Sequence, residues 1–186
     1  MAFILTVPRC TGNVGWGAVS YFAMSIYQTA VLKPPHLKAI MPWEGISDIY
    51  REVNMVGGIP NVAFQQLWMD MTGNGLGRSE DHAVLSIEHP MFDECWQPKV
   101  VDWRLIDIPA FSVTGWSSLG LHLRGTIEAW KHFSSQDKYL LVHVSIETIF
   151  GNVSVLTGGI NRVVVSGVNT TKSTMFKNKS RFSTSI

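Results

Sequence analysis

A serine stands where the spacing of apolar residues changes from that of a strand to that of a helix. Residues Val14–Val19 are small or apolar, as in a strand buried on both faces. After Ser20, apolar side chains recur at helical spacing as far as Val31, and the two prolines at 34 and 35 end the helix. A serine at such a turn projects its hydroxyl beside the amides of the helix N-terminus, which can stabilise a developing oxyanion. Ser20 is therefore a candidate nucleophile.

The strand, turn and helix around Ser20 fit the nucleophile elbow of an α/β-hydrolase. The position two before the serine, usually glycine, holds Ala18, and the position two after it holds Phe22. Both positions pack closely, so small residues are expected there. The alternative is an ordinary helix whose first residue is capped by the serine, a frequent role for this side chain. Spacing alone favours the capping role.

Several blocks of the sequence, in order, resemble the cocaine esterase and X-Pro dipeptidyl-peptidase family of serine hydrolases. They cover about three quarters of the chain, and ordered blocks are more specific than a single motif. The resemblance ends near residues 138–143. The blocks are Gly12–Tyr21, Pro35–Arg51, Gly57–Pro60, His89–Glu94, Ile108–Trp116 and Gly120–Trp130.

The resemblance implies a partial α/β-hydrolase fold over residues 1–143. We expect a parallel sheet with strands at residues 14–19, 37–41, 108–114 and 138–144, and with the first strands of the fold missing. A helical cap is expected at about residues 44–101, with helices near 49–56 and 63–71, and it would shape an apolar acyl or leaving-group pocket. A further helix is expected at residues 121–133. Residues 144–186 form a divergent Ser/Thr/Val-rich tail, which either makes short strands, such as residues 161–168, or stays loose.

The resemblance also implies the rest of a catalytic site. The Tyr21 backbone N–H would contribute to the oxyanion hole, as the residue after the nucleophile does in this fold. The family's acid position falls on Ser118, which cannot stabilise an imidazolium by charge. His143, at the end of the last strand, is the candidate base, although a structural role for it is favoured because it lies slightly before the family's catalytic position. The catalytic assignments are therefore Ser20 and His143, with an altered acid position.

Other polar residues are interpreted as structural. Glu44 follows the strand after the elbow helix, where open α/β sheets place their ligands, but a loop-fixing role or a pair with Arg51 is favoured. His82 and His89 are expected on the surface or in loops, without ligand partners. His122 and His132 lie on a helix and are weaker candidates for a base than His143.

Composition excludes several function classes. The 186 residues carry a net charge of +1, with 46% hydrophobic and 16% charged residues, which describes a globular chain and gives no reason to expect nucleic acid as a partner. Cys10 and Cys95 lie far apart, which suits a reducing compartment and a cytoplasmic location. We expect no metal or other cofactor, because no metal motif or phosphate loop is present. No apolar run is long enough for a membrane span.

The sequence therefore predicts a serine hydrolase that cleaves an ester or amide through an acyl-serine intermediate. Its partner would be a small ester or peptide substrate, and an exposed sheet edge could lead to self-association. The alternative is a catalytically dead, truncated hydrolase domain that binds a ligand or partner or has no independent function. The changed acid position favours this alternative for the isolated chain, while the family's chemistry favours the enzyme.

Overall fold

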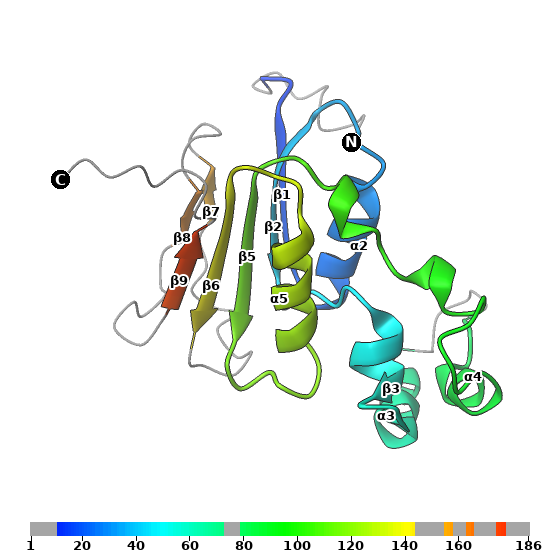
Figure 1. Ribbon diagram of the computed structural model, residues 1–186. Coiled ribbons are helices and arrows are strands. Elements are labelled where there is room, and N and C mark those ends of the chain that lie inside the picture. Colours follow the sequence, from blue (N-terminus) through cyan, green and yellow to red (C-terminus); the bar gives the residue numbers. More distant parts are fainter. Residues whose placement is uncertain (1–10, 73–78, 144–154, 158–162, 166–173, 178–186) are drawn as a thin grey trace.

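A five-stranded sheet is the centre of the described chain. The computed structural model describes residues 11–72, 79–143, 155–157, 163–165 and 174–177. The strand order is β1 (Val14–Val19), β2 (Leu37–Trp43), β5 (Ala110–Gly115), β6 (Lys138–His143) and β9 (Thr174–Lys177) (Figure 1). The first four strands are parallel, and β9 pairs antiparallel with β6. The predicted α/β class with a parallel sheet is confirmed.

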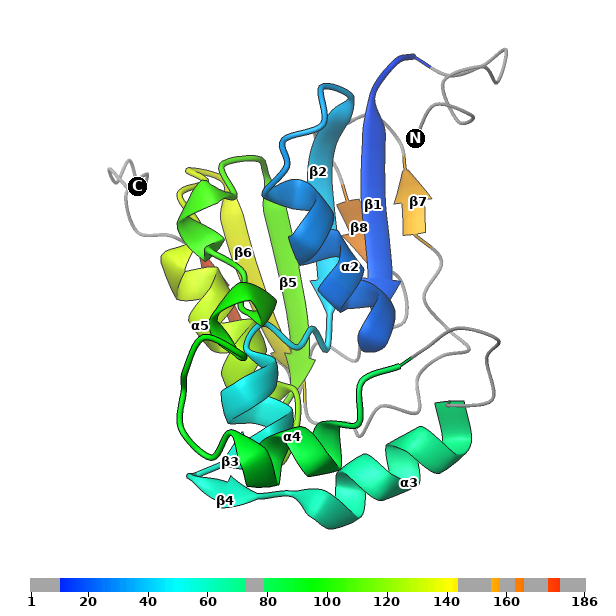
Figure 2. The same ribbon diagram turned by 90° about the vertical axis from the view of Figure 1, so that its right-hand side faces the viewer.

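Two helices cover one face of this sheet, α2 (Tyr21–Ala30) and α5 (Leu123–His132) (Figure 2). Both connect parallel strands, as a crossover must when consecutive strands run in the same direction. Their apolar faces meet over the sheet, where Tyr27 of α2 lies 6.0 Å from Phe133, ring centre to ring centre. The buried core at this contact comprises Ile26, Tyr27, Ala30, Leu37, Ile40, Val101, Ile106, Ala110, Ala129 and Phe133. This packing fixes the direction in which α2 leaves β1.

A group of short elements lies beyond the carboxyl ends of the parallel strands (Figures 1 and 2). It comprises a π-helical turn (Tyr50–Asn54), strands β3 (Met55–Val56) and β4 (Ile59–Pro60), and helices α3 (Val62–Thr72) and α4 (His82–Glu88). The expected helix at residues 49–56 is wrong in its last part. Residues 55 and 56 form a strand, because Gly57 and Gly58 adopt positive φ angles of 64° and 84° and turn the chain into a hairpin.

Short strands are also described beyond β6. β7 (Val155–Thr157) pairs antiparallel with β8 (Val163–Val165), and β9 lies at one edge of the main sheet. β8 falls within the predicted strand at residues 161–168. The remainder of residues 144–186 lies outside the described residues, so the boundary at residue 144 stays a prediction.

The opposite edge of the described sheet is β1. No described strand pairs with its outer side, and unpaired strand edges favour association with another chain. Self-association through this edge stays a prediction. No helix in the described part of the chain has both the length and the apolar character that a membrane span requires.

Glu52, a buried carboxylate in the π-helical turn, ties the elements beyond the sheet to α5. Its Oε2 accepts hydrogen bonds from the backbone N–H groups of Ser47 at 2.9 Å and Asp48 at 3.1 Å, and Arg124 of α5 donates to Oε1 at 3.1 Å. Helix α5 can approach this closely because Gly125 has no side chain. A Cβ atom at Gly125 would lie 2.0 Å from Glu52 Oε2.

Gly125→Ala is expected to lower the free energy of unfolding by about 3 kcal/mol, because the added methyl group overlaps a carboxylate held by several hydrogen bonds. Intrinsic helix propensity would give the opposite sign, since alanine is favoured over glycine inside a helix by about 1 kcal/mol. Denaturant unfolding measures the change. Gly120→Ala is the matched control, because nothing lies within 4 Å of a Cβ at that position. Equal stability of the two variants would show that α5 does not press on Glu52.

The same carboxylate should make stability depend on pH. Burial raises the pKa of Glu52 from 4.5 to about 7, and this effect outweighs the hydrogen bonds to the carboxylate and the attraction of Arg124. A raised pKa means that the folded state holds the proton more tightly than the unfolded state. The resulting stabilisation is complete below pH 4.5 and is lost as the pH rises through about 7.

We therefore expect Glu52 to reduce the free energy of unfolding by about 3 kcal/mol between pH 4.5 and pH 8. Glu52→Gln removes the titrating group and keeps an oxygen acceptor. The stability of this variant should vary less over that range, as measured by urea unfolding at several pH values. An unchanged slope in Glu52→Gln would show that other groups set the pH dependence.

Candidate active site

Ser20 is the single residue between β1 and α2, and its backbone is strained. Its φ and ψ angles are 56° and −123°, a region that residues other than glycine rarely adopt. Its backbone N–H donates to the carbonyl of Trp43 at 2.9 Å, and its carbonyl accepts from Ala23 N at 2.9 Å. The side chain makes no capping hydrogen bond to α2. The geometry is therefore that of an elbow, and the capping role that spacing favoured is wrong.

Tyr21 begins α2 directly after the strained residue. The first amides of a helix have no acceptor within the helix. The Tyr21 N–H is one of them, and it could therefore donate a hydrogen bond to a negative charge beside Ser20. The Tyr21 ring lies 6.4 Å from the ring of Trp68 on α3. The turn at Ser20 is thus in contact with α3. The assignment of Tyr21 to the oxyanion hole stays a prediction.

A cavity of about 590 Å³ opens beside Ser20, between the elbow and the elements beyond the sheet. Its walls come from α2, from the segment after β2, from α3 and α4, and from the loop before α5. Most of the lining side chains are apolar, namely Met24, Ile46, Ile49, Val53, Phe64, Trp68, Met69 and Leu121. A cavity of this size and composition suits a small apolar ligand group. The helical insertion thus lines a pocket that includes the elbow serine.

His143 is the last residue of β6 and is buried, with 5% of its surface exposed. Its Nε2 lies 3.8 Å from Oε1 of Glu44, and its ring centre lies 5.7 Å from that of Trp43. Two strands, β2 and β5, separate β6 from β1 in the sheet. The imidazole therefore extends over the end of β5 toward β2, the strand next to the elbow.

Glu44, for which a loop-fixing role or a pair with Arg51 was expected, does fix its loop, because its Oε1 accepts from Gly115 N at 2.6 Å, and its surroundings also make it a candidate for the site. It follows β2 directly, is 1% exposed, and has a positive φ angle of 52°. The expected pair with Arg51 is wrong, because Arg51 bonds to Asp48, three residues before it. The available signal was the position of a carboxylate at the carboxyl end of a parallel strand.

Ser118, the altered acid position, lies in the turn between β5 and α5. Its N–H donates to the carbonyl of Gly115 at 3.1 Å, and its own carbonyl accepts from the N–H groups of residues 121–123. These contacts organise the start of α5. Ser118 therefore has a structural role at the start of α5.

The other histidines differ in their surroundings. His82 starts α4, lines the cavity, and lies 3.8 Å from Glu80, and burial lowers its pKa below the ordinary value. His122 is buried before α5, and burial lowers its pKa to about 4, so this side chain is neutral near pH 7. His132 is half exposed and bonds to the carbonyl of Glu128. Of these three, His82 is the one on the cavity wall.

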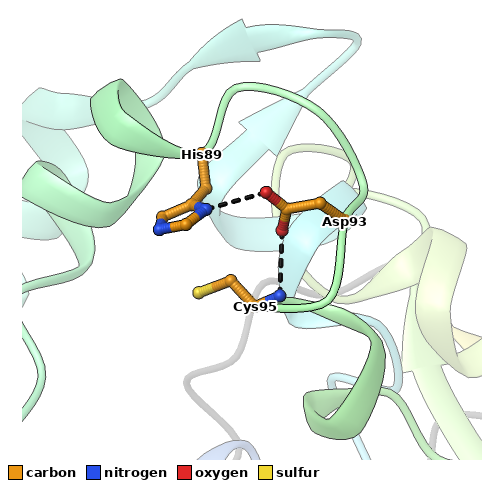
Figure 3. Close-up of side chains that lie close together, drawn as sticks. All are labelled: His89, Asp93 and Cys95. Carbon is orange, nitrogen blue, oxygen red and sulfur yellow. Dashed lines mark hydrogen bonds and ion pairs between the residues drawn. The ribbon is translucent and has the colours of Figure 1, made fainter.

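His89, Asp93 and Cys95 form the one group among the described residues whose donor atoms could surround a metal ion (Figure 3). His89 was expected to have no ligand partners, but donor atoms of Asp93 and Cys95 lie close to it, and its Nδ1 lies 2.7 Å from Asp93 Oδ2. The other carboxylate oxygen accepts from Cys95 N at 2.9 Å, and the indole of Trp96 donates to the carbonyl of His89 at 2.8 Å. These bonds close a turn after α4. The hydrogen bonds of Asp93 to His89 and Cys95 give these residues a structural role in the turn.

Comparison with known proteins agrees with this architecture. The model of the X-Pro dipeptidyl-peptidase (S15) family matches residues 3–86. Two crystal structures of a CocE/NonD family hydrolase from Staphylococcus aureus are 36% and 37% identical to the chain, with TM-scores of 0.70 and 0.69. An acylaminoacyl peptidase from Pyrococcus horikoshii shares the fold at 14% identity and a TM-score of 0.53, over 81% of this chain and 23% of that one. No curated protein sequence matches the chain.

The similarity to the Staphylococcus aureus hydrolase covers 76% of this chain and 26% of that protein. The chain therefore spans about a quarter of the length of this solved relative. The residues that the family model matches, 3–86, include β1, Ser20 and α2.

Proposed function

We propose that this chain, which is similar to the CocE/NonD and X-Pro dipeptidyl-peptidase (S15) hydrolases, cleaves an ester or amide bond through an acyl-Ser20 intermediate. The observation that carries this proposal is Ser20 itself. Its backbone is held in a strained conformation between strand and helix, on the wall of a largely apolar cavity. Such strain costs about 1–3 kcal/mol and persists where the surrounding structure maintains it.

In the proposed reaction, the Ser20 hydroxyl oxygen forms a bond to the acyl carbon while His143 accepts the hydroxyl proton. The carbonyl electron pair moves to its oxygen, and the Tyr21 N–H stabilises that negative charge. Collapse of the intermediate breaks the bond to the leaving alcohol or amine, which takes the proton from His143. Water then attacks the acyl group, with His143 again accepting and returning the proton.

The cavity favours a substrate with an uncharged, apolar acyl or leaving group. Phe64 and Trp68 of α3 offer aromatic surface on the cavity wall, and Met24 of α2 lies on the same wall. The carboxylate of Glu80 also lines the cavity, but both of its oxygens accept from Lys99 at 2.8 Å. That pairing reduces the attraction of Glu80 for a substrate cation. We infer that neutral esters are better substrates than peptides with a charged amino terminus.

A pre-steady-state experiment with p-nitrophenyl butyrate tests this function. An acyl-serine route releases up to one equivalent of p-nitrophenol per protein before slower turnover, and mass spectrometry of quenched protein detects the added butyryl group. An uncharged butyryl ester should react faster than the matching ester of a free α-amino acid. Release of p-nitrophenol without any protein-bound acyl group would contradict a covalent route.

A second candidate is a binding domain without catalysis. The observation in its favour is the neutral side chain of Ser118 where the family has an acid. In that case the cavity would bind an apolar ligand, and Ser20 would stay unmodified. Ligand binding in the absence of any acyl transfer distinguishes this candidate from the enzyme.

A further inference from the structure

We propose that Glu44, the residue directly after β2, is the carboxylate that orients His143 and stabilises its protonated form. It takes the place of the acid that the family has at the Ser118 position. Glu44 is then a positioning residue, which acts through His143. This inference rests on the proposed function of Ser20 and His143. It departs from the family pattern, in which the acid follows the strand that here is β5.

The first argument is the place that the carboxylate reaches. Glu44 belongs to the chain segment after β2, but its Oε1 accepts a hydrogen bond from Gly115 N at 2.6 Å. Gly115 is the last residue of β5, three residues before Ser118. Glu44, directly after the neighbouring strand β2, thus places a carboxylate at the end of β5, where the side chain of Ser118 has none.

The second argument is the pair that this carboxylate forms. Oε1 of Glu44 lies 3.8 Å from Nε2 of His143, and the two residues are 1% and 5% exposed. Water screens a buried pair of opposite charges far less than a surface pair, so Glu44 can stabilise an imidazolium strongly. The distance is longer than a hydrogen bond, as is common for catalytic contacts in sites without substrate. The ring nitrogen that does not face Glu44 would accept the Ser20 proton.

The third argument is that the backbone at Glu44 is strained. Its φ angle of 52° is one of three positive values among the described residues other than glycine, and Ser20 has another. Both strained residues directly follow neighbouring parallel strands, and the Ser20 N–H bonds to Trp43, the residue before Glu44. A buried carboxyl group is also expensive to retain for a loop contact that a neutral amide could make. The strain and the buried carboxyl group point to a function at the carboxyl ends of β1 and β2.

The decisive variant is Glu44→Gln, which can keep the acceptor for Gly115 N but loses the charge. We expect the rate of Ser20 acylation by p-nitrophenyl butyrate to fall by about 10³–10⁴-fold, because a neutral amide neither stabilises the imidazolium nor holds the reactive tautomer. Glu44→Asp should restore part of the rate, and Ser118→Ala should leave it unchanged. Thermal melting of each variant shows whether it remains folded.

An NMR titration of His143 provides a readout that does not need catalysis. Removing the neighbouring negative charge should move the titration midpoint of His143 to lower pH in Glu44→Gln, and Glu44→Asp should keep it near the wild-type value. If wild-type protein is not acylated but this shift occurs, the proposed function fails and the coupling of Glu44 to His143 stands. If Glu44→Gln leaves both the titration midpoint and the acylation rate unchanged, Glu44 only fixes its loop and the inference is wrong.

Discussion

Ser20→Ala is expected to abolish acyl transfer, with a loss of turnover on the order of 10⁶-fold relative to the intact chain. Alanine removes the attacking oxygen and leaves the binding cavity in place, so apolar ligands should still bind. The measurement is the rate of p-nitrophenyl butyrate hydrolysis, corrected for the reaction in buffer. The melting temperature should change little, because the Ser20 side chain makes no capping hydrogen bond.

Ser25→Ala is the matched control for Ser20→Ala. Ser25 lies on α2, the helix that follows Ser20, and its hydroxyl donates to the carbonyl of Phe22 at 2.6 Å. Its loss should leave the hydrolysis rate unchanged. A Ser20→Ala variant that hydrolyses the ester as fast as the intact chain would place the chemistry at another residue.

His143→Gln should lower the acylation rate by about 10⁴-fold or more, because glutamine cannot accept the proton of Ser20. Glutamine is preferred to alanine for this test. The imidazole is buried against Trp43, so alanine at position 143 would leave a cavity at the carboxyl end of β6. The acylation rate is compared at pH 8, where an ordinary imidazole is neutral.

His82→Gln is the rival variant, because His82 lines the same cavity as Ser20. We expect its rate to stay within a few-fold of the intact chain. If His82→Gln loses the activity and His143→Gln retains it, the base is His82 of α4 and the assignment of His143 is wrong. Equal activity in all three proteins would exclude both His82 and His143 as the base.

Much of the fold could be predicted because its signals are local. The run Val14–Val19 forms β1 as expected, since a short apolar segment before a turn favours a strand, but the expected burial on both faces is wrong because β1 lies at the edge of the described sheet and only Val14 is buried. The two prolines correctly set the end of α2. The strand expected at residues 37–41 extends to Trp43, because Pro42 does not stop β2 from pairing in parallel with β1.

The candidate site was harder to predict because its parts meet through the sheet. The approach of Glu44 to Gly115 joins residues 71 positions apart, and no local pattern records it. Glu44 was expected to fix a loop or to pair with Arg51; the loop contact is present, whereas Arg51 pairs with Asp48, three positions before it. The resemblance to the family directed attention to Ser118, the position after β5. In the structure, the carboxyl group of Glu44, the residue after β2, lies at Gly115, three residues before Ser118.

Labelling with a fluorophosphonate probe tests the central claim most directly. Such a probe reacts with a serine hydroxyl only when the surrounding site activates it, and peptide mapping identifies the serine that carries the phosphonyl group. We predict a single adduct on Ser20, lost in Ser20→Ala, strongly slowed in His143→Gln and unchanged in Ser25→Ala. Folded protein that shows no adduct, or an adduct on another serine, would contradict the proposed hydrolase and favour a binding domain that keeps only the hydrolase fold.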